Sequence, residues 1–235
     1  MQFGVATSTV DEFSGILGIG YGQGIATRYN NFMDELRSQN AIKAKAFTVA
    51  LGSKHVQEGV IVFGGVDTSK FSGTLARLPI IPAADSPDGV PRYWINMQSL
   101  QLTPPSGQPK IYPNSSFPVF LDSGATMTLL PADLASKIAT DFGSKDALSG
   151  DFYEVSCDLT TVNGTLDFVF AGTTIKVPYD ELIRTVQSTP PTCFLGISPS
   201  KDFTLLGDSF MRSAYGSFPP PTLSGSVSRH LSNMP

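Results

Sequence analysis

The sequence predicts an all-β protein with a few short helices. Its 235 residues include 22 glycines and 18 prolines, and only 15% are charged, against roughly 25% in ordinary globular proteins. Apolar residues make up 41%, enough for a substantial core in one large or two small domains. Glycine and proline between short apolar runs are typical of short strands joined by tight turns.

The first hundred residues show strand patterns and one helix. Residues 3–25 begin apolar and become glycine-rich. A helix is expected over 27–40, where Phe32, Met33 and Leu36 fall on one face. Strands are expected at 46–51, 60–63 and 93–102, with a loop rich in Pro, Asp and Gly at 82–92.

The second half contains the clearest helical pattern, over 130–142. Pro131 suits a first helical position, and Leu134, Ile138 and Phe142 recur every four residues. Further strands are expected at 152–157, 165–170, 174–177, 193–198 and 203–206, and short helices at 179–186 and 209–214. After Tyr215 the pattern ends, and we expect residues 219–235, which begin with three prolines, to form an irregular tail.

Charge and motif content exclude several classes of partner. The net charge is −4 with no basic block, so nucleic acid is not expected. No apolar run reaches the ~20 residues of a membrane span. The first residues have neither a basic segment nor an apolar core, so this chain is expected to carry no signal peptide. No cluster of histidines and acids predicts a metal, and no cofactor is expected.

Two kinds of feature indicate an oxidising compartment. Asn114-Ser115-Ser116 and Asn163-Gly164-Thr165 are candidate glycosylation sequons. Cys157 and Cys193 form the chain's cysteine pair, which the residues alone allow to be either two buried thiols or a disulfide.

The most informative segment is Val119-Phe120-Leu121-Asp122-Ser123-Gly124-Ala125-Thr126. Three apolar, strand-forming residues run into an aspartate, and small residues follow. A strand is therefore expected to deliver the Asp122 carboxylate to a tight turn, where Gly124 lets other backbone or substrate come close. On its own, Asp-Ser-Gly is usually only a turn.

Two other motifs do not support a site. The glycines between Gly18 and Gly24 do not fit the spacing Gly-x-Gly-x-x-Gly, so a dinucleotide site is rejected. Gly207-Asp208-Ser209 is similar to a serine-esterase block, but no aspartate lies three residues before His230, so that reading is rejected too.

Taken together, the segments in their order resemble those of pepsin-like aspartic peptidases, closest to the secreted fungal branch. The resemblance covers most of the chain. It rests on Asp122-Ser123-Gly124 and on these further segments: Phe13-Ser14-Gly15-Ile16-Leu17-Gly18, Val62-Phe63-Gly64-Gly65-Val66-Asp67, Tyr93-Trp94-Ile95 and Leu205-Leu206-Gly207-Asp208-Ser209-Phe210.

The resemblance implies an incomplete pepsin-like acid protease fold. Residues 1–75 would be a remnant of the N-terminal lobe, 76–218 the C-terminal lobe with the catalytic-type turn, and 219–235 the irregular tail. It also implies a disulfide between Cys157 and Cys193. Without covering strands, Ile16, Leu17 and Ile19 are expected to be exposed, and one sheet edge of the C-terminal lobe is expected to stay open.

The resemblance also assigns roles in aspartic-type endopeptidase chemistry. Asp122 would be one of two catalytic aspartates, which share one proton because like charges that close cannot both ionise. Ser123 would hydrogen-bond across the pair, and Gly124 would meet the substrate backbone. Ala125 replaces a usual hydroxyl residue, and Thr126 keeps one. Leu205, Leu206 and Gly207 would wrap the turn.

One departure from the family pattern decides what to expect of this chain. The family needs a second turn, Asp-Thr-Gly, which this sequence lacks. The expected partners are therefore a peptide or protein substrate and possibly a missing N-terminal half. The expected location is secreted or vacuolar, and the chain alone is expected to be inactive. The alternative is an inactive remnant or a peptide-binding half-cleft.

Overall fold

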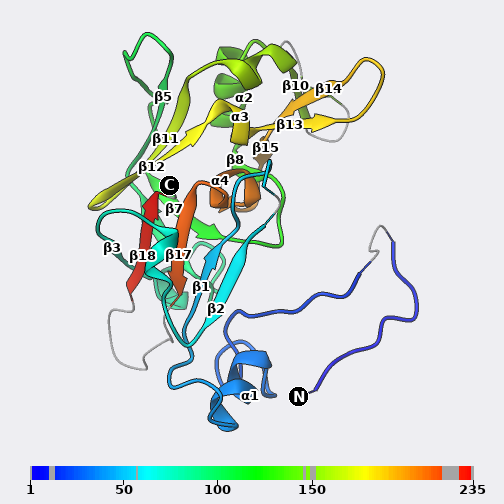
Figure 1. Ribbon diagram of the computed structural model, residues 1–235, viewed down its shortest axis with the longest axis vertical. Coiled ribbons are helices and arrows are strands. Elements are labelled where there is room, and N and C mark those ends of the chain that lie inside the picture. Colours follow the sequence, from blue (N-terminus) through cyan, green and yellow to red (C-terminus); the bar gives the residue numbers. More distant parts are fainter. Residues whose placement is uncertain are drawn as a thin grey trace.

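Strands dominate the computed structural model, which describes residues 2–10, 14–56, 58–144, 147–148, 152–218 and 228–233. They form four sheets, and the helices among these residues are short (Figure 1), which confirms the predicted all-β class. The α-helices are α1 (Phe32–Ser38), α2 (Ala132–Asp141), α3 (Tyr179–Leu182) and α4 (Asp208–Met211). Single 3₁₀ segments are η1 (Thr68–Lys70), η2 (Ala83–Asp85) and η3 (Cys157–Thr161).

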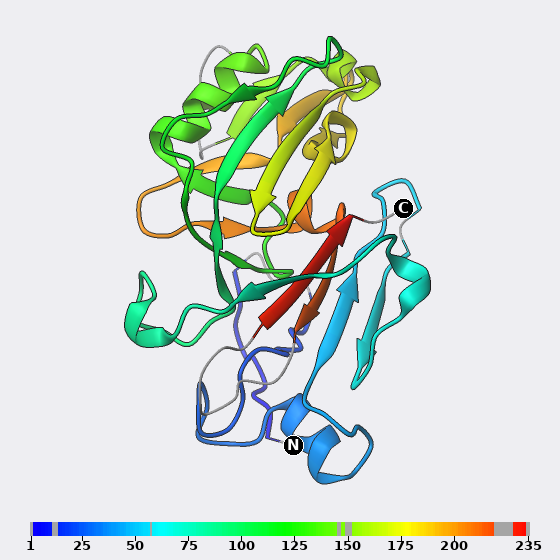
Figure 2. The same cartoon turned by 90° about the vertical axis from the view of Figure 1, so that its left-hand side faces the viewer.

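One five-stranded sheet joins the two ends of the chain. Its order is β2-β1-β17-β18-β3, and all neighbouring strands are antiparallel. Figure 2 shows it below the other sheets. The strands are β1 (Phe47–Ala50), β2 (Val60–Phe63), β3 (Ala76–Pro79), β17 (Ala214–Phe218) and β18 (Ser228–Asn233). Strands from the predicted segments 1–75, 76–218 and 219–235 therefore meet in one sheet.

The end of the chain differs from the sequence-based expectation. The irregular tail predicted at 219–235 is wrong for residues 228–233, which form β18 and pair with β17 and β3. The pattern also continues past Tyr215, because β17 extends to Phe218. Backbone N–H and C=O groups form these pairs, and they do so for any side-chain pattern. Residues 228–233 have no apolar periodicity, so the sequence pattern did not predict the strand. The edge expected to stay open beside β17 is therefore filled.

A second five-stranded sheet, of order β15-β8-β16-β7-β4, contains the Asp122 segment. Its strands are β4 (Trp94–Met97), β7 (Phe117–Leu121), β8 (Thr128–Pro131), β15 (Ile197–Ser200) and β16 (Leu205–Leu206). β16 runs parallel to β7 and antiparallel to β8. This short strand therefore holds together the two strands on either side of the Asp122 turn.

Two four-stranded sheets complete the upper part of Figure 1. One, of order β12-β11-β5-β6, contains β5 (Ser99–Thr103), β6 (Lys110–Ile111), β11 (Thr165–Phe170) and β12 (Thr173–Pro178). The other, of order β13-β14-β10-β9, contains β9 (Ala147–Leu148), β10 (Phe152–Val155), β13 (Ile183–Val186) and β14 (Thr192–Leu195).

Helix boundaries differ from the sequence-based expectation where strands compete. α2 buries Leu134 and Ile138 as predicted, but it begins only at Ala132, because Thr128–Pro131 pairs with β15 as strand β8. The helix expected at 179–186 ends at Leu182, and its second half forms β13 against β14. β-branched residues favour this pairing.

The first helix is also shorter than predicted. α1 begins after Asn31, whose side chain accepts the Asp34 N–H at 3.0 Å, while the Asp34 carboxylate accepts the Asn31 N–H at 3.0 Å. This reciprocal capping box fixes the helix start at Phe32, five residues after the expected position at Thr27.

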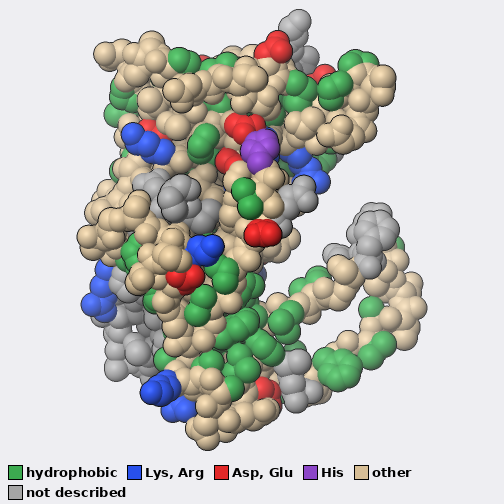
Figure 3. Space-filling view, in the orientation of Figure 1, with side chains coloured by type: hydrophobic (Ala, Val, Ile, Leu, Met, Phe, Trp, Pro, Cys, Tyr) green, Lys and Arg blue, Asp and Glu red, His purple; other side chains and the backbone are tan. Residues whose placement is uncertain are grey.

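The N-terminal segment that precedes α1 extends away from the rest of the chain (Figure 1). Hydrophobic side chains gather along this segment and over the lower part of the face in Figure 3. Ile16 is 82% exposed and Leu17 56%, as expected without covering strands. Ile19 is instead partly buried against the core. Phe13 lies outside the described residues. None of the described helices is long and apolar enough to span a membrane.

The cysteine pair is a disulfide, as the resemblance implied. Cys157 begins η3 and Cys193 lies in β14, and the two Sγ atoms are bonded. The bond closes a segment with a sequence separation of 36. That segment contains β11, β12, α3 and β13, so the bond restricts these four elements in the unfolded chain.

Replacing both Cys157 and Cys193 by serine should lower the free energy of unfolding by about 4 kcal/mol, because the unfolded chain regains the entropy of this loop. Equilibrium denaturation of the oxidised wild type and the double variant measures the difference. Reduced wild type is the control and should match the double variant. Equal stability of all three would contradict the prediction.

Candidate active site

The Asp122 turn begins where β7 leaves the core. Val119, Phe120 and Leu121 are buried, whereas Asp122 is only half-buried. The Asp122 N–H donates to the Leu206 carbonyl at 3.1 Å, and its carboxylate accepts the Gly124 N–H at 2.9 Å. The strand thus ends on an oriented carboxylate at the surface, as the sequence predicted.

The wrapping segment passes beside this turn. Leu205 and Leu206 lie opposite Phe120 and Leu121 in a parallel pair. A Cβ added to Gly207 would lie 2.4 Å from the carbonyl oxygens of Ala125 and Met127. Only a glycine fits there without displacing the backbone of the turn.

Two backbone bonds then tie α4 to the far side of the turn. The Asp208 N–H donates to the Ala125 carbonyl at 2.8 Å, and the Ser209 N–H donates to the Thr126 carbonyl at 3.1 Å. The turn is therefore held at Asp122 by β16 and at its end by the first residues of α4. Ser123, Gly124 and Thr126 are exposed, and Ala125 is half-buried.

Sequence reasoning missed the role of Ser209. Its hydroxyl oxygen is buried, accepts the Thr128 N–H at 3.1 Å, and lies 2.7 Å from the Gly196 carbonyl oxygen and 2.9 Å from Thr128 Oγ1. Three segments, α4, β8 and the residue before β15, therefore meet at one side chain. The serine itself was the only local signal, and its partners are distant in sequence.

The sequence analysis also missed Asp208, whose pKa responds to the charge of Asp122. Burial raises the pKa of Asp208, Arg212 opposes this effect, and the charge of Asp122 adds to it. Within the described part of the chain, Asp208 Oδ1 is buried without a hydrogen-bond partner. The nearest ion-pair contact, from Arg212 to Asp208 Oδ2, is 3.7 Å. A half-buried carboxyl group with a raised pKa thus lies behind the turn.

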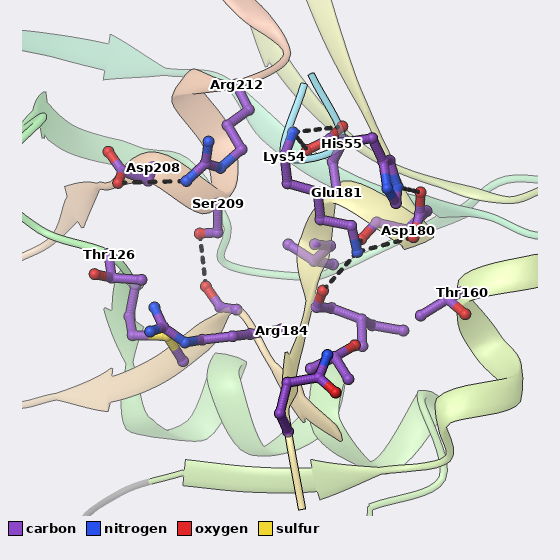
Figure 4. Close-up of a pocket in the computed structure, with 16 residues that line it drawn as sticks. Lys54, His55, Thr126, Thr160, Asp180, Glu181, Arg184, Asp208, Ser209 and Arg212 are labelled. Carbon is purple, nitrogen blue, oxygen red and sulfur yellow. Dashed lines mark hydrogen bonds and ion pairs between the residues drawn. The ribbon is translucent and has the colours of Figure 1, made fainter. Parts of the chain in front are cut away.

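A polar cavity of about 600 Å³ opens beside the turn and α4 (Figure 4). Thr126, Asp208 and Ser209 line one side. Residues from the loop after β1 and from α3 and β13 line the other, among them Lys54, His55, Asp180, Glu181 and Arg184.

Ion pairs join the loop after β1 to α3 along this second side of the cavity. Lys54 Nζ lies 2.8 Å from Asp180 Oδ1, and His55 Nε2 lies 2.5 Å from Asp180 Oδ2. The Glu181 carboxylate accepts the Lys54 N–H at 3.2 Å and the hydroxyl hydrogen of Ser53. These four contacts, which we name the loop–α3 cluster, join residues more than 120 positions apart.

The asparagines of both sequons lie on the surface. Asn114 is exposed in the turn before β7, and Asn163 is exposed between η3 and β11. Exposure is what a glycan requires, and their modification stays a prediction.

A strand that ends in Asp-Ser-Gly and is wrapped by a parallel apolar-apolar-Gly segment is the arrangement expected from the resemblance to pepsin-like aspartic peptidases. Residues 1–222 match the family model described as Eukaryotic aspartyl protease, and the chain belongs to this family. Members of this family are aspartic endopeptidases, which catalyse proteolysis.

Several fungal proteins are similar over nearly the whole chain. The acid protease of Saccharomycopsis fibuligera is 33% identical over 226 residues, 92% of this chain and 56% of the relative. Secreted aspartic protease 3 of Candida albicans is 36% identical over 224 residues, 91% and 52%. Aspartic proteinase 3 of Saccharomyces cerevisiae is 32% identical over 232 residues, 92% and 40%. The chain thus spans about half the length of these relatives.

Gly207→Ala should destabilise the fold by about 1–3 kcal/mol, because the new methyl group would meet two carbonyl oxygens of the turn. Thermal or chemical unfolding measures this loss. Gly65→Ala is the matched control, since its Cβ would meet only Val62 Cγ1, at an ordinary 3.5 Å. It should change stability by less than about 1 kcal/mol. Equal effects would show that the turn is not tightly wrapped.

Asp180→Asn should lower the melting temperature near pH 6 and change it little near pH 2. Burial alone would raise the pKa of Asp180, but Lys54 and His55 outweigh it and hold the pKa below its usual 3.8. The stabilisation is therefore present above pH 3.8, on the order of 1 kcal/mol, and disappears as the pH falls through the lowered value.

Melting curves from pH 2 to pH 7 test this dependence. Asp202→Asn, which removes an exposed carboxylate in the loop between β15 and β16, outside the loop–α3 cluster, is the matched control. A constant difference between Asp180→Asn and wild type across this range would exclude the loop–α3 cluster as its source.

Proposed function

We propose that this chain supplies one half of an aspartic endopeptidase active site, with Asp122 as one of the two catalytic carboxylates. The observation that carries the proposal is the turn itself: β7 delivers Asp122 to the surface, and the 205–209 segment holds the turn by backbone bonds at both ends. Membership of the aspartyl protease family supports this role.

The chemistry requires a second carboxylate. An ionised aspartate takes a proton from a bound water molecule, and a protonated partner gives one to the carbonyl of the scissile peptide. No covalent intermediate forms. We propose that an Asp-Thr-Gly turn from an N-terminal half supplies the partner, since the chain spans about half the length of its relatives.

The other residues of the turn receive supporting roles. Ser123, exposed next to Asp122, hydrogen-bonds across the carboxylate pair, and Gly124 presents backbone to the peptide. Thr126 faces the adjoining cavity. We place the whole protein in a secreted or vacuolar compartment, where its disulfide is stable.

The alternative function is a peptide-binding half-cleft without catalysis. An exposed apolar cavity next to Thr126 favours it, because such a cavity binds side chains whether or not a second aspartate is present. Catalysis distinguishes the two.

The 235-residue polypeptide alone should hydrolyse a quenched peptide at about pH 4 no faster than background, because one carboxylate cannot accept and donate a proton in the same step. General acid–base assistance contributes ~10²–10⁴-fold. Co-expression with an N-terminal half carrying Asp-Thr-Gly should restore activity, and Asp122→Asn in that complex should abolish it.

Asp133→Asn in the same complex is the control and should keep full activity. Activity that survives Asp122→Asn would refute the catalytic role. Turnover by the polypeptide alone that is lost in Asp122→Asn would mean that two copies of Asp122 form the pair.

A further inference from the structure

A second cavity, of about 450 Å³, opens beside the turn and is mostly apolar. It shares Thr126, Met127 and Arg184 with the polar cavity. Its lining consists of Thr126, Met127, Phe152, Arg184, Val186 and Phe194. Thr126 ends the Asp122 turn, so an occupant of this cavity lies next to the proposed site of hydrolysis.

The apolar walls of the cavity are open to solvent. Phe152 is 42% exposed and Val186 43%, although large apolar side chains are usually buried. The rings of Phe152 and Phe194 lie edge to face with centroids 6.0 Å apart, on neighbouring strands β10 and β14. Water in contact with these walls is displaced favourably by an apolar side chain.

Among the described residues, Arg184 contributes the only charge in this lining. It is exposed, and in the described part of the chain its side chain makes no hydrogen bond or ion pair. Figure 4 shows it extended toward Thr126. A free guanidinium of this kind binds a carboxylate through two parallel hydrogen bonds.

Burial raises the pKa of Asp208, and the positive charge of Arg184 acts against this rise. Within the described residues, the Asp208 carboxylate forms its ion pair with Arg212, at 3.7 Å. Asp180 and Glu181 also line the polar cavity, but both are engaged in the loop–α3 cluster. Arg184 therefore remains available to an incoming ligand.

The spacing of Arg184 and Val186 fits an extended peptide. They lie two residues apart on β13, so their side chains emerge on the same face. In an extended peptide, side chains two positions apart also share a face, at a matching distance of about 7 Å. A peptide that runs along β13 can therefore present one side chain to each residue.

We propose that this cavity selects peptides with a large apolar side chain and an acidic side chain two positions apart. The apolar group enters between Phe152, Val186 and Phe194, and the carboxylate binds Arg184. The inference rests on the proposed function in one respect: it takes the Asp122 turn to be a site for peptide substrates.

Peptide binding to the Asp122→Asn variant of the full 235-residue chain tests the proposal without requiring catalysis. Fluorescent peptides of otherwise equal sequence carry Glu-Ala-Phe, Gln-Ala-Phe or Glu-Ala-Ala, each also in reverse order. At pH 5, Glu-Ala-Phe or its reverse should bind about threefold to fivefold more tightly than its Gln counterpart, and about tenfold or more tightly than its Ala counterpart. At pH 3 the advantage of Glu over Gln should disappear, because the peptide carboxylate is protonated.

Substitutions assign each preference to its residue. Arg184→Gln should remove the Glu preference and keep the Phe preference, whereas Arg184→Lys should keep part of both. Phe194→Ala should reduce the Phe preference, with circular dichroism confirming that the variant is folded. Lys137→Gln, an exposed cation on α2 outside the cavity, should change neither.

Equal affinity for the Glu and Gln peptides at pH 5, or no binding of any peptide at millimolar concentration, would overturn the proposal. So would a Glu preference that persists in Arg184→Gln. None of these outcomes contradicts a catalytic role for Asp122. That role is tested separately, by the peptidase activity of the complex with the N-terminal half.

Discussion

The backbone bonds between the 205–209 segment and the Asp122 turn are the constraint on which the site depends. Leu206 fixes the start of the turn, and the N–H groups of Asp208 and Ser209 fix its end. Gly207 allows the two chains to approach this closely. Because every contact uses main-chain atoms, the turn can vary its side chains, as with Ala125, without losing its shape. The carboxylate is therefore positioned by the fold rather than by its neighbours' chemistry.

A second set of contacts links the region of this turn to the five-stranded sheet that contains β1. The loop after β1 is joined to α3 by Lys54, His55 and Asp180, and α3 continues directly into β13. β13 lines both cavities next to the turn. The position of Arg184 thus depends on a loop that belongs to the other sheet. The ion pairs that make this connection weaken in strong acid, because Asp180 is then protonated.

Local patterns allowed much of the site to be predicted. Asp122, its turn, and the 205–207 segment are contiguous runs with a recognisable order, and the cysteine pair followed from the same resemblance. Ser209, Asp208 and Asp180 were missed because their roles depend on partners far away in sequence. β13 was predicted as a helix because its pairing with β14 outweighs the local preference, and β18 was missed because backbone pairing alone specifies it. Tertiary contacts decided each of these cases.

The sheet of order β2-β1-β17-β18-β3 joins strands that are synthesised at different times. β1 and β2 are made well before β17, which is the neighbour of β1 in the sheet. At ~5–20 residues per second, the β1–β2 hairpin waits on the order of ten seconds for that neighbour. During this interval Phe47 lacks the ring of Phe218, which stacks on it at 4.6 Å in the finished sheet. A nascent chain that stalls before residue 214 therefore exposes an apolar hairpin, which is the kind of surface that chaperones and proteases recognise.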